Sequence, residues 1–82
     1  MYVLKSQKDG DCYIGSTSDL KKRFREHNEG IVNSTRPRRP FRLVYYEAYS
    51  AEKDARLRES NLKLRSRAYT QLKTMIAESL KS

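Results

Sequence analysis

The chain opens with a turn signal between two runs of strand-forming residues. Asp9-Gly10 separates residues 1–6 (MYVLKS) from residues 12–16 (CYIGS), and glycine accepts the positive φ that a tight hairpin turn needs. This pattern predicts two antiparallel strands at the N-terminus. Gly15, late in the second run, marks either a bulge or a place where another group approaches the backbone.

A helix is predicted directly after this hairpin, over residues 19–29. Three hydroxyl residues at positions 16–18 offer N-caps, Asp19 suits the positive end of a helix, and Gly30 is a natural stop. The next ten residues, 31–40, contain both prolines of the chain and predict a loop.

The second half predicts one strand and two helices. Residues 41–49 form the best strand of the chain, and we expect it at the centre of the sheet because apolar residues occur on both of its faces. Ser50 predicts the start of a helix on which Leu57 and Leu64 form one contact line. A last helix is expected over residues 68–80. The order β-β-α-β-α-α defines an α+β fold with a small, mostly antiparallel three-stranded sheet flanked by helices.

Length and charge narrow the function. The 82 residues suffice for a single domain, 1–82, and 18 Lys+Arg against 10 Asp+Glu give a net charge of +8. Such a surplus favours a polyanionic partner, of which nucleic acid is the commonest, and the alternative is that charge only aids solubility. No run approaches the ~20 apolar residues of a membrane span, so we expect no membrane partner and a cytoplasmic protein, nucleoid-associated at most. Cys12 and His27 are single residues of their types, which excludes an internal disulfide and a Cys/His zinc site.

Glu59 lies at the border of the apolar stripe of the second predicted helix, where an unpaired carboxylate is unfavourable. It follows Ala55 by four positions and precedes Leu62 by three. Burying a lone carboxylate costs several kcal/mol unless a cation or hydrogen-bond donor meets it. Two interpretations stay open. The partner is an arginine such as Arg56 or Arg58, or it is a divalent metal that is otherwise held by water and substrate phosphate.

Four other residues carry a similar choice. His27 is a polar cap on the first helix or a proton-transfer group, and Arg23, one turn earlier, is a solvated cation or a phosphate ligand. Tyr2 and Tyr13 lie on adjacent strands of the predicted hairpin, where they form an aromatic pair or supply a phenol as a base. None of these residues identifies a function by itself. A functional site requires that their side chains lie on one face of the molecule.

Together these residues resemble a known family. Tyr2-Val3-Leu4 followed by Tyr13-Ile14-Gly15 resembles the paired motif of the GIY-YIG nucleases, and Arg23, His27 and Glu59 follow in the expected order. The resemblance spans residues 1–67 and is greatest to short, stand-alone bacterial members. The Gly-Ile of the first signature is missing, so Tyr2 stands beside the chain terminus, where fraying is expected.

The resemblance implies a metal-dependent endonuclease that hydrolyses phosphodiester bonds in DNA. Glu59 would hold one Mg²⁺ or Mn²⁺ ion, Arg23 would contact the phosphate, and Tyr2 would be the general base. Tyr13 and His27 would hydrogen-bond the nucleophile, the phosphate or the base. The resemblance leaves open DNA repair, recombination or restriction-type processing, RNA as a substrate, and a partner protein or oligomer that supplies specificity.

Basic residues would grip the nucleic acid backbone, with four arginines crowded into seven residues before and within the third strand. The candidate contacts are Gly15, Lys22, Arg36, Arg38, Arg39, Arg42, Arg58 and Lys63. The alternative function is a catalytically inactive module that binds DNA or RNA through the arginine segment and through Arg56, Arg58, Lys63, Arg65 and Arg67. Both functions predict salt-sensitive binding by counterion release, but only the nuclease requires Glu59 and a metal.

Overall fold

The computed structural model describes residues 1–64 and 67–81, so the predicted basic contact Arg65 lies outside the described residues. The elements are β1 (Tyr2–Ser6), β2 (Cys12–Gly15), α1 (Leu20–Glu29), a short 3₁₀ turn (Arg36–Arg38), β3 (Phe41–Tyr46), α2 (Glu52–Lys63), α3 (Arg67–Met75) and α4 (Ala77–Lys81). The predicted α+β order is confirmed, with the last helix divided in two. Within the described residues, no helix is long and apolar enough to cross a membrane.

The three strands form one antiparallel sheet in the order β2-β1-β3. The strand predicted to be central, β3, is therefore an edge strand, and β1 is the central one. The prediction was wrong because apolar residues on both faces of β3 reflect helices on both sides of the sheet: Phe41 packs on one face and Val44 on the other. β3 also ends at Tyr46 rather than at residue 49.

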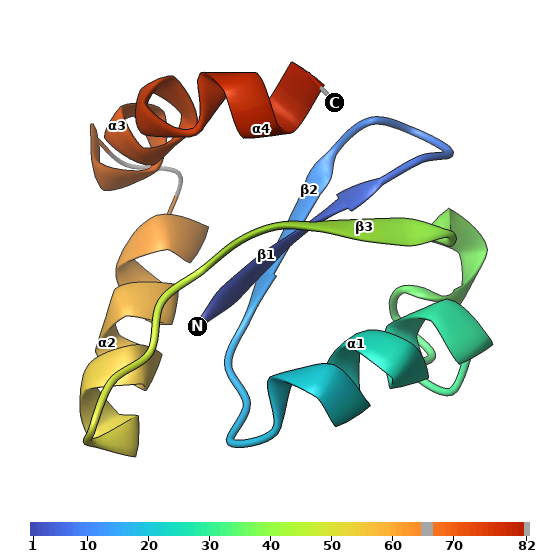
Figure 1. Cartoon of the computed structure of the whole chain (residues 1–82), viewed down its shortest axis with the longest axis horizontal. Helices are drawn as coiled ribbons and strands as arrows, with labels where there is room; N and C mark the ends of the chain where they lie inside the picture. The colour runs from blue at the N-terminus through green and yellow to red at the C-terminus, as the bar shows by residue number, and fades with distance from the viewer. Residues whose placement is uncertain (65–66, 82) are drawn as a thin grey trace.

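The sheet lies between two helical layers (Figure 1). α1 covers one face, where Tyr2, Leu4 and Phe41 form the buried cluster. The other face carries the larger cluster, which includes Val3, Ile14 and Val44 from the sheet, Leu62 from α2, and Tyr69, Leu72 and Ile76 from the C-terminal helices and the residue between them. Alternate residues of β1 thus belong to different layers, as the twofold repeat of a strand requires.

The second helical layer differs from the sequence predictions in two respects, although Leu62 lies on the predicted apolar stripe. α2 begins at Glu52 with Ala51 as its N-cap and no side-chain cap, so Ser50 does not start it. Leu57 and Leu64 are 62% and 76% exposed, so the contact line predicted for them is wrong. α2 docks instead through Leu62, which is fully buried.

The predicted helix over residues 68–80 is two short helices, α3 and α4. Met75, at the end of α3, is 63% exposed. Ile76, between the two helices, is buried. Ile76 rather than Met75 therefore packs into the core where α3 ends.

The C-terminal end of α1 follows the sequence signal, but the N-terminal end does not: the helix begins at Leu20, and its N-cap is Asp19 rather than one of the three hydroxyl residues before it. Asp19 is the N-cap and its side chain accepts a hydrogen bond from the backbone N–H of Lys22 at 3.1 Å. Gly30 takes the left-handed conformation (φ 79°) that commonly ends a helix. Between these caps His27 is the buried residue of α1 and faces the sheet.

Candidate active site

Tyr2 is held in the central strand rather than at a frayed end. It pairs with Gly15 of β2 on one side and Tyr46 of β3 on the other, and it is 1% exposed. The backbone of Met1 is also fixed, because its amino group donates to the carbonyl of Glu47 at 3.1 Å and its carbonyl accepts from the Glu47 N–H at 2.8 Å. The expected fraying is therefore wrong.

Gly15 makes room for the Tyr2 ring. A Cβ built on Gly15 would lie 2.5 Å from Cζ of Tyr2, which is closer than real side chains approach. The bulge that the sequence also allowed is not at this glycine, since the register shift falls between Val3 and Leu4 in the pairing of β1 with β3. Of the two interpretations of Gly15, close approach is the one that the structure bears out.

Gly15→Ala is therefore expected to displace Tyr2 and to lower stability by about 1–3 kcal/mol, the usual range for overpacking a core. Thermal denaturation measures this cost. On a Tyr2→Ala background the same glycine substitution should cost much less, because the ring that it strikes is gone. An equal cost on both backgrounds would show that the clash is not the cause.

His27 connects Tyr2 to a residue that sequence reasoning missed. Its ring is fully buried; Nε2 lies 3.0 Å from the Tyr2 hydroxyl, and Nδ1 lies 2.8 Å from Oγ1 of Thr35. The Tyr13 ring packs against the imidazole at 5.0 Å between centroids. Nothing in the pattern of the loop could identify Thr35, because its role depends on the loop folding back onto α1.

Burial lowers the pKa of His27 below its ordinary value of 6.5, and the positive charge of Arg23 lowers it further. The unfolded chain therefore binds a proton at this histidine at a higher pH than the folded protein does. We expect the free energy of unfolding to fall as pH drops below about 6.5, by at most about 1.4 kcal/mol per pH unit from this group. Denaturant unfolding at several pH values should give a shallower slope for His27→Gln, and equal slopes would contradict the burial effect.

Arg23 lies beside the Tyr2 hydroxyl at the edge of the buried cluster. Burial raises the pKa of Tyr2, and the hydrogen bond with Arg23 opposes that rise. The guanidinium also pairs with Glu26 at 3.4 Å, yet 37% of the Arg23 side chain is exposed. It borders a hollow of about 390 Å³ that the loop residues 16–18 and Lys22 also line. Arg23 can therefore reach a phosphate from outside while its charge acts on the phenol within.

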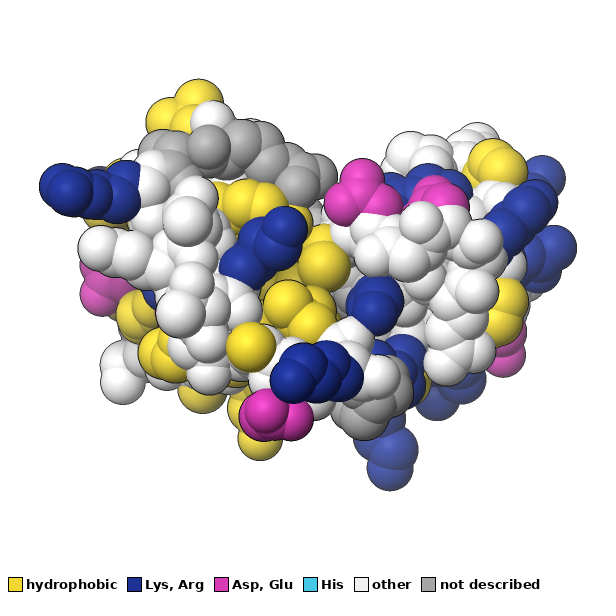
Figure 2. Space-filling model, turned by 90° about the horizontal axis from the view of Figure 1, so that it is seen from above, with side chains coloured by type: hydrophobic (Ala, Val, Ile, Leu, Met, Phe, Trp, Pro, Cys, Tyr) yellow, Lys and Arg dark blue, Asp and Glu magenta, His cyan; other side chains and the backbone are white. Residues whose placement is uncertain are grey.

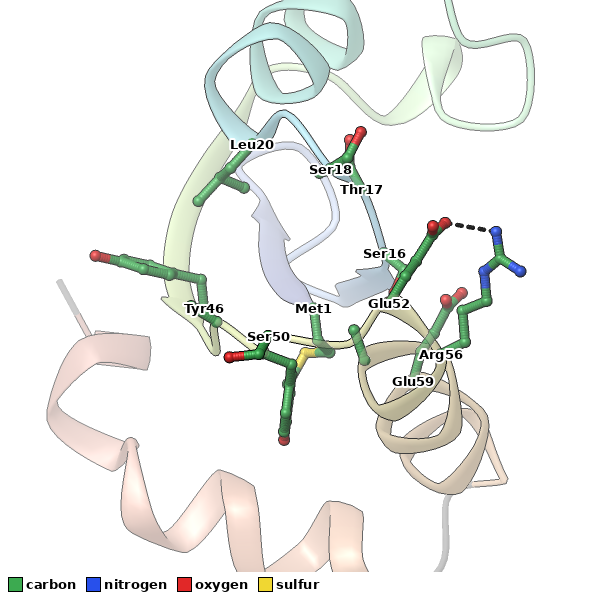
Figure 3. Close-up of a pocket in the computed structure, with 13 residues that line it drawn as sticks. Met1, Ser16, Thr17, Ser18, Leu20, Tyr46, Ser50, Glu52, Arg56 and Glu59 are labelled. Atoms are coloured by element: carbon green, nitrogen blue, oxygen red, sulfur yellow. Dashed lines mark hydrogen bonds and ion pairs between the residues drawn. The ribbon is translucent and has the colours of Figure 1, made fainter.

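Glu59 faces a second hollow, of about 620 Å³, on the other side of the same loop. Figure 3 shows Glu59 and Glu52 extending from α2 on the side where Ser16 lies. Glu59 is paired with Lys63, one turn along α2, and its side chain is 19% exposed. Burial is the largest cause of the raised pKa of Tyr2, and the negative charge of Glu59 also raises it, by a smaller amount. The glutamate therefore lies within electrostatic reach of the phenol.

The residues around this second hollow fit a single divalent ion. Glu59 offers a carboxylate, and the buried Ser16 hydroxyl, which has no hydrogen-bond partner among the described residues, lines the same hollow. No group of three or more His, Cys, Asp or Glu side chains gathers within residues 1–64 and 67–81. An ion here would take one carboxylate and complete its shell with water and phosphate, the mode that Mg²⁺ favours. The Lys63 ammonium would then have to leave Glu59.

Several residues that were predicted to contact the nucleic acid backbone are hydrogen-bonded or ion-paired to other residues of the protein. Arg36 donates to the Gly30 carbonyl at 2.7 Å, and Arg38 pairs with Asp9 at 2.9 Å. Arg58 makes two hydrogen bonds to Glu47, at 3.1 and 3.2 Å, which hold α2 against the end of β3. Of the remaining candidates, Lys22, Arg39 and Lys63 are exposed, and Arg42, partly exposed, donates to the Ser79 carbonyl.

Positive charge is unevenly spread. In Figure 2, Lys and Arg side chains gather on the right, where Figure 1 places the β1–β2 turn and the segment before β3. This is the end of the molecule at which the arginine segment leaves α1.

The structure brings Tyr2, Tyr13, Gly15, Arg23 and His27 into one cluster, with Glu59 across the loop from Arg23.

Comparisons with known proteins identify the family. The chain matches the GIY-YIG catalytic domain family over residues 1–73. It is 43% identical over 63 residues to a UPF0213 protein of Bacillus pumilus, covering 76% of this chain and 63% of that protein. It is 40% identical over 68 residues to a UPF0213 protein of Streptococcus agalactiae, covering 82% of this chain and 76% of that protein.

A third relative, the UPF0213 protein YazA of Bacillus subtilis, is 42% identical over 55 residues, covering 66% of this chain and 54% of the relative. The chain thus spans between about half and three quarters of the length of these relatives. No solved structure matches it. The family match covers most of the sequence and includes every residue of the cluster, and the chain belongs to the GIY-YIG catalytic domain family.

Proposed function

We propose that the protein is a metal-dependent endonuclease that hydrolyses phosphodiester bonds in DNA. The observation that carries this proposal is a buried phenol hydrogen-bonded to a buried imidazole and lying within the electrostatic reach of a guanidinium, with one carboxylate facing the adjoining hollow. Tyr2 and His27 make the hydrogen bond, Arg23 supplies the guanidinium, and Glu59 is the carboxylate. Packing alone would favour apolar side chains at such buried positions.

Each group has a distinct task in the proposed reaction. Tyr2, whose hydroxyl lies 3.0 Å from Nε2 of His27, takes a proton from the attacking water as its own proton passes to the histidine. Arg23 binds the phosphate and strengthens its hold as negative charge develops. Tyr13 packs against the imidazole and keeps the ring facing Tyr2.

A divalent ion, when bound at Glu59, supplies Lewis-acid stabilisation of the phosphate. Ser16, whose hydroxyl is buried and without a partner among the described residues, also lines the hollow that Glu59 faces. Glu59 is the one acidic residue assigned to the site, which supports one ion rather than two, because a two-metal site usually needs several carboxylates.

A plasmid-nicking assay tests the proposal directly. Purified protein is expected to nick supercoiled DNA with Mg²⁺ or Mn²⁺ and to stop when a chelator is added. Binding to DNA without nicking under any metal would favour the alternative, an inactive basic module. Nicking that persists with the chelator would contradict metal dependence.

The arginine segment gives a separate prediction about binding. Arg39 is exposed, whereas Arg36 is held by the Gly30 carbonyl and by Asn33 at 3.0 Å. Arg39→Gln is expected to reduce the slope of log K against log salt by about 0.9, the value for one lost phosphate contact on duplex DNA, with little effect on stability. Arg36→Gln should lower the melting temperature more. Titrations with chelator present, so that no cleavage occurs, measure the slope, and an unchanged slope for Arg39→Gln would exclude a phosphate contact there.

A further inference from the structure

Thr35 is a buried hydroxyl that the reaction described above does not use. Its side chain is fully buried, and Oγ1 lies 2.8 Å from Nδ1 of His27 and 3.4 Å from the carbonyl oxygen of Val32. Thr35 is also the N-cap residue of the 3₁₀ turn, although its side chain makes no cap hydrogen bond there. The hydroxyl is thus directed at the histidine rather than at the turn.

The single hydrogen of this hydroxyl sets the direction of the hydrogen bonds around His27. When Thr35 donates this hydrogen to the Val32 carbonyl, 3.4 Å away, it can only accept toward the imidazole. In that arrangement Nδ1 of His27 carries the ring proton, and Nε2 presents a lone pair to the Tyr2 hydroxyl. The opposite tautomer would place a proton on Nε2, where it would prevent transfer from Tyr2.

We propose that Thr35 is a positioning residue that holds neutral His27 in the Nδ1–H tautomer, so that Nε2 can accept the proton of Tyr2. This inference rests on the proposed nuclease function. Burial of His27 supports it, because burial favours the neutral imidazole, in which only one nitrogen can accept.

The proton transfer balances within the named groups. An O–H bond of the attacking water breaks, and its oxygen forms a bond to phosphorus while the bond from phosphorus to the leaving oxygen breaks. The water proton bonds to Oη of Tyr2, and the former Tyr2 proton bonds to Nε2 of His27. The histidine becomes an imidazolium whose Nδ1–H still donates to Thr35, and it later returns a proton to solvent, from which the leaving oxygen takes one.

The chain is well suited to a direct test, because it has a single histidine. Protein labelled with ¹⁵N in histidine gives one imidazole in the NMR spectrum, and the shifts and N–H couplings of its two nitrogens report the tautomer. At a pH where His27 is neutral, we expect the proton on Nδ1 in the wild type and in Thr35→Ser. In Thr35→Val, which has no hydroxyl to accept it, we expect the proton to move toward Nε2.

Cleavage should follow the tautomer. Thr35→Val is expected to lower the single-turnover rate about 100-fold, at the low end of what a positioned acid–base group contributes, and Thr35→Ser should restore most of it. Thr70→Val, the same substitution at an exposed threonine of α3, should change neither the spectrum nor the rate.

Three outcomes would overturn the proposal. These are a proton on Nε2 in the wild type, the same tautomer in Thr35→Val as in the wild type, and a folded Thr35→Ser that stays as slow as Thr35→Val. Should Thr35→Val fail to fold, the wild-type spectrum and the rate of Thr35→Ser decide the question. A wild-type protein that never nicks DNA contradicts the proposed function, whereas a nicking protein with an unmoved tautomer contradicts only the part assigned to Thr35.

Discussion

Glu59→Gln is expected to lower the rate of metal-dependent nicking about 1,000-fold or more. The amide keeps the shape of the side chain but removes the charge that would hold the ion, and loss of several kcal/mol of transition-state stabilisation corresponds to factors of this size. The free energy of unfolding should hardly change, because the substitution removes only a partly exposed ion pair with Lys63 on the same helix. Initial nicking rates at saturating Mg²⁺ measure the effect.

Glu52 provides a matched control on the same helix. It lines the same hollow as Glu59 but is 66% exposed and pairs with Arg56 (Figure 3). Glu52→Gln is expected to keep the wild-type rate within a few-fold. Equal losses in the two variants would mean that the hollow needs only general negative charge, and nicking by Glu59→Gln at the wild-type rate would end the proposed assignment of the metal ligand.

Tyr2→Phe is expected to slow cleavage by about 10²–10⁴-fold, the range contributed by general acid–base groups. Phenylalanine keeps the ring that fills the space beside Gly15 but lacks the hydroxyl that contacts His27. The variant should also lose about 1–3 kcal/mol of stability, since a buried nitrogen of His27 is left without a partner. Single-turnover cleavage and thermal denaturation separate the two effects.

Tyr69→Phe is the control for this substitution, because Tyr69 is a buried tyrosine in the cluster on the other face of the sheet. It should leave the rate of cleavage unchanged. If Tyr2→Phe cuts as fast as this control, Tyr2 serves packing alone, and another group must accept the proton of the water.

The sequence predicted local structure better than it predicted which layer each segment joins. The hairpin, the Gly30 stop and the order of elements depend on turn and cap chemistry that short stretches of chain contain. The position of β3 in the sheet could not be predicted, because its apolar pattern shows only that both of its faces are covered. That pattern is the same for a central strand and for an edge strand between helices.

The candidate site shows the same division. Tyr2, Arg23, His27 and Glu59 are recognisable because their order and spacing resemble a family motif. Thr35 and Ser16 are ordinary loop residues in the sequence, and they gain importance only where the fold leaves one hydroxyl against an imidazole and another buried without a partner among the described residues. No periodicity or motif marks them.

The separation of the site between the two helical layers has a consequence for its durability. The phenol and imidazole belong to the sheet and α1, while Glu59 is carried by α2, whose docking depends on the buried Leu62. A local opening that releases α2 would part the carboxylate from the phenol and leave the hairpin folded. The proposed chemistry therefore requires α2 to stay docked on the sheet, and we expect a local release of α2 to abolish cleavage even while the hairpin remains folded.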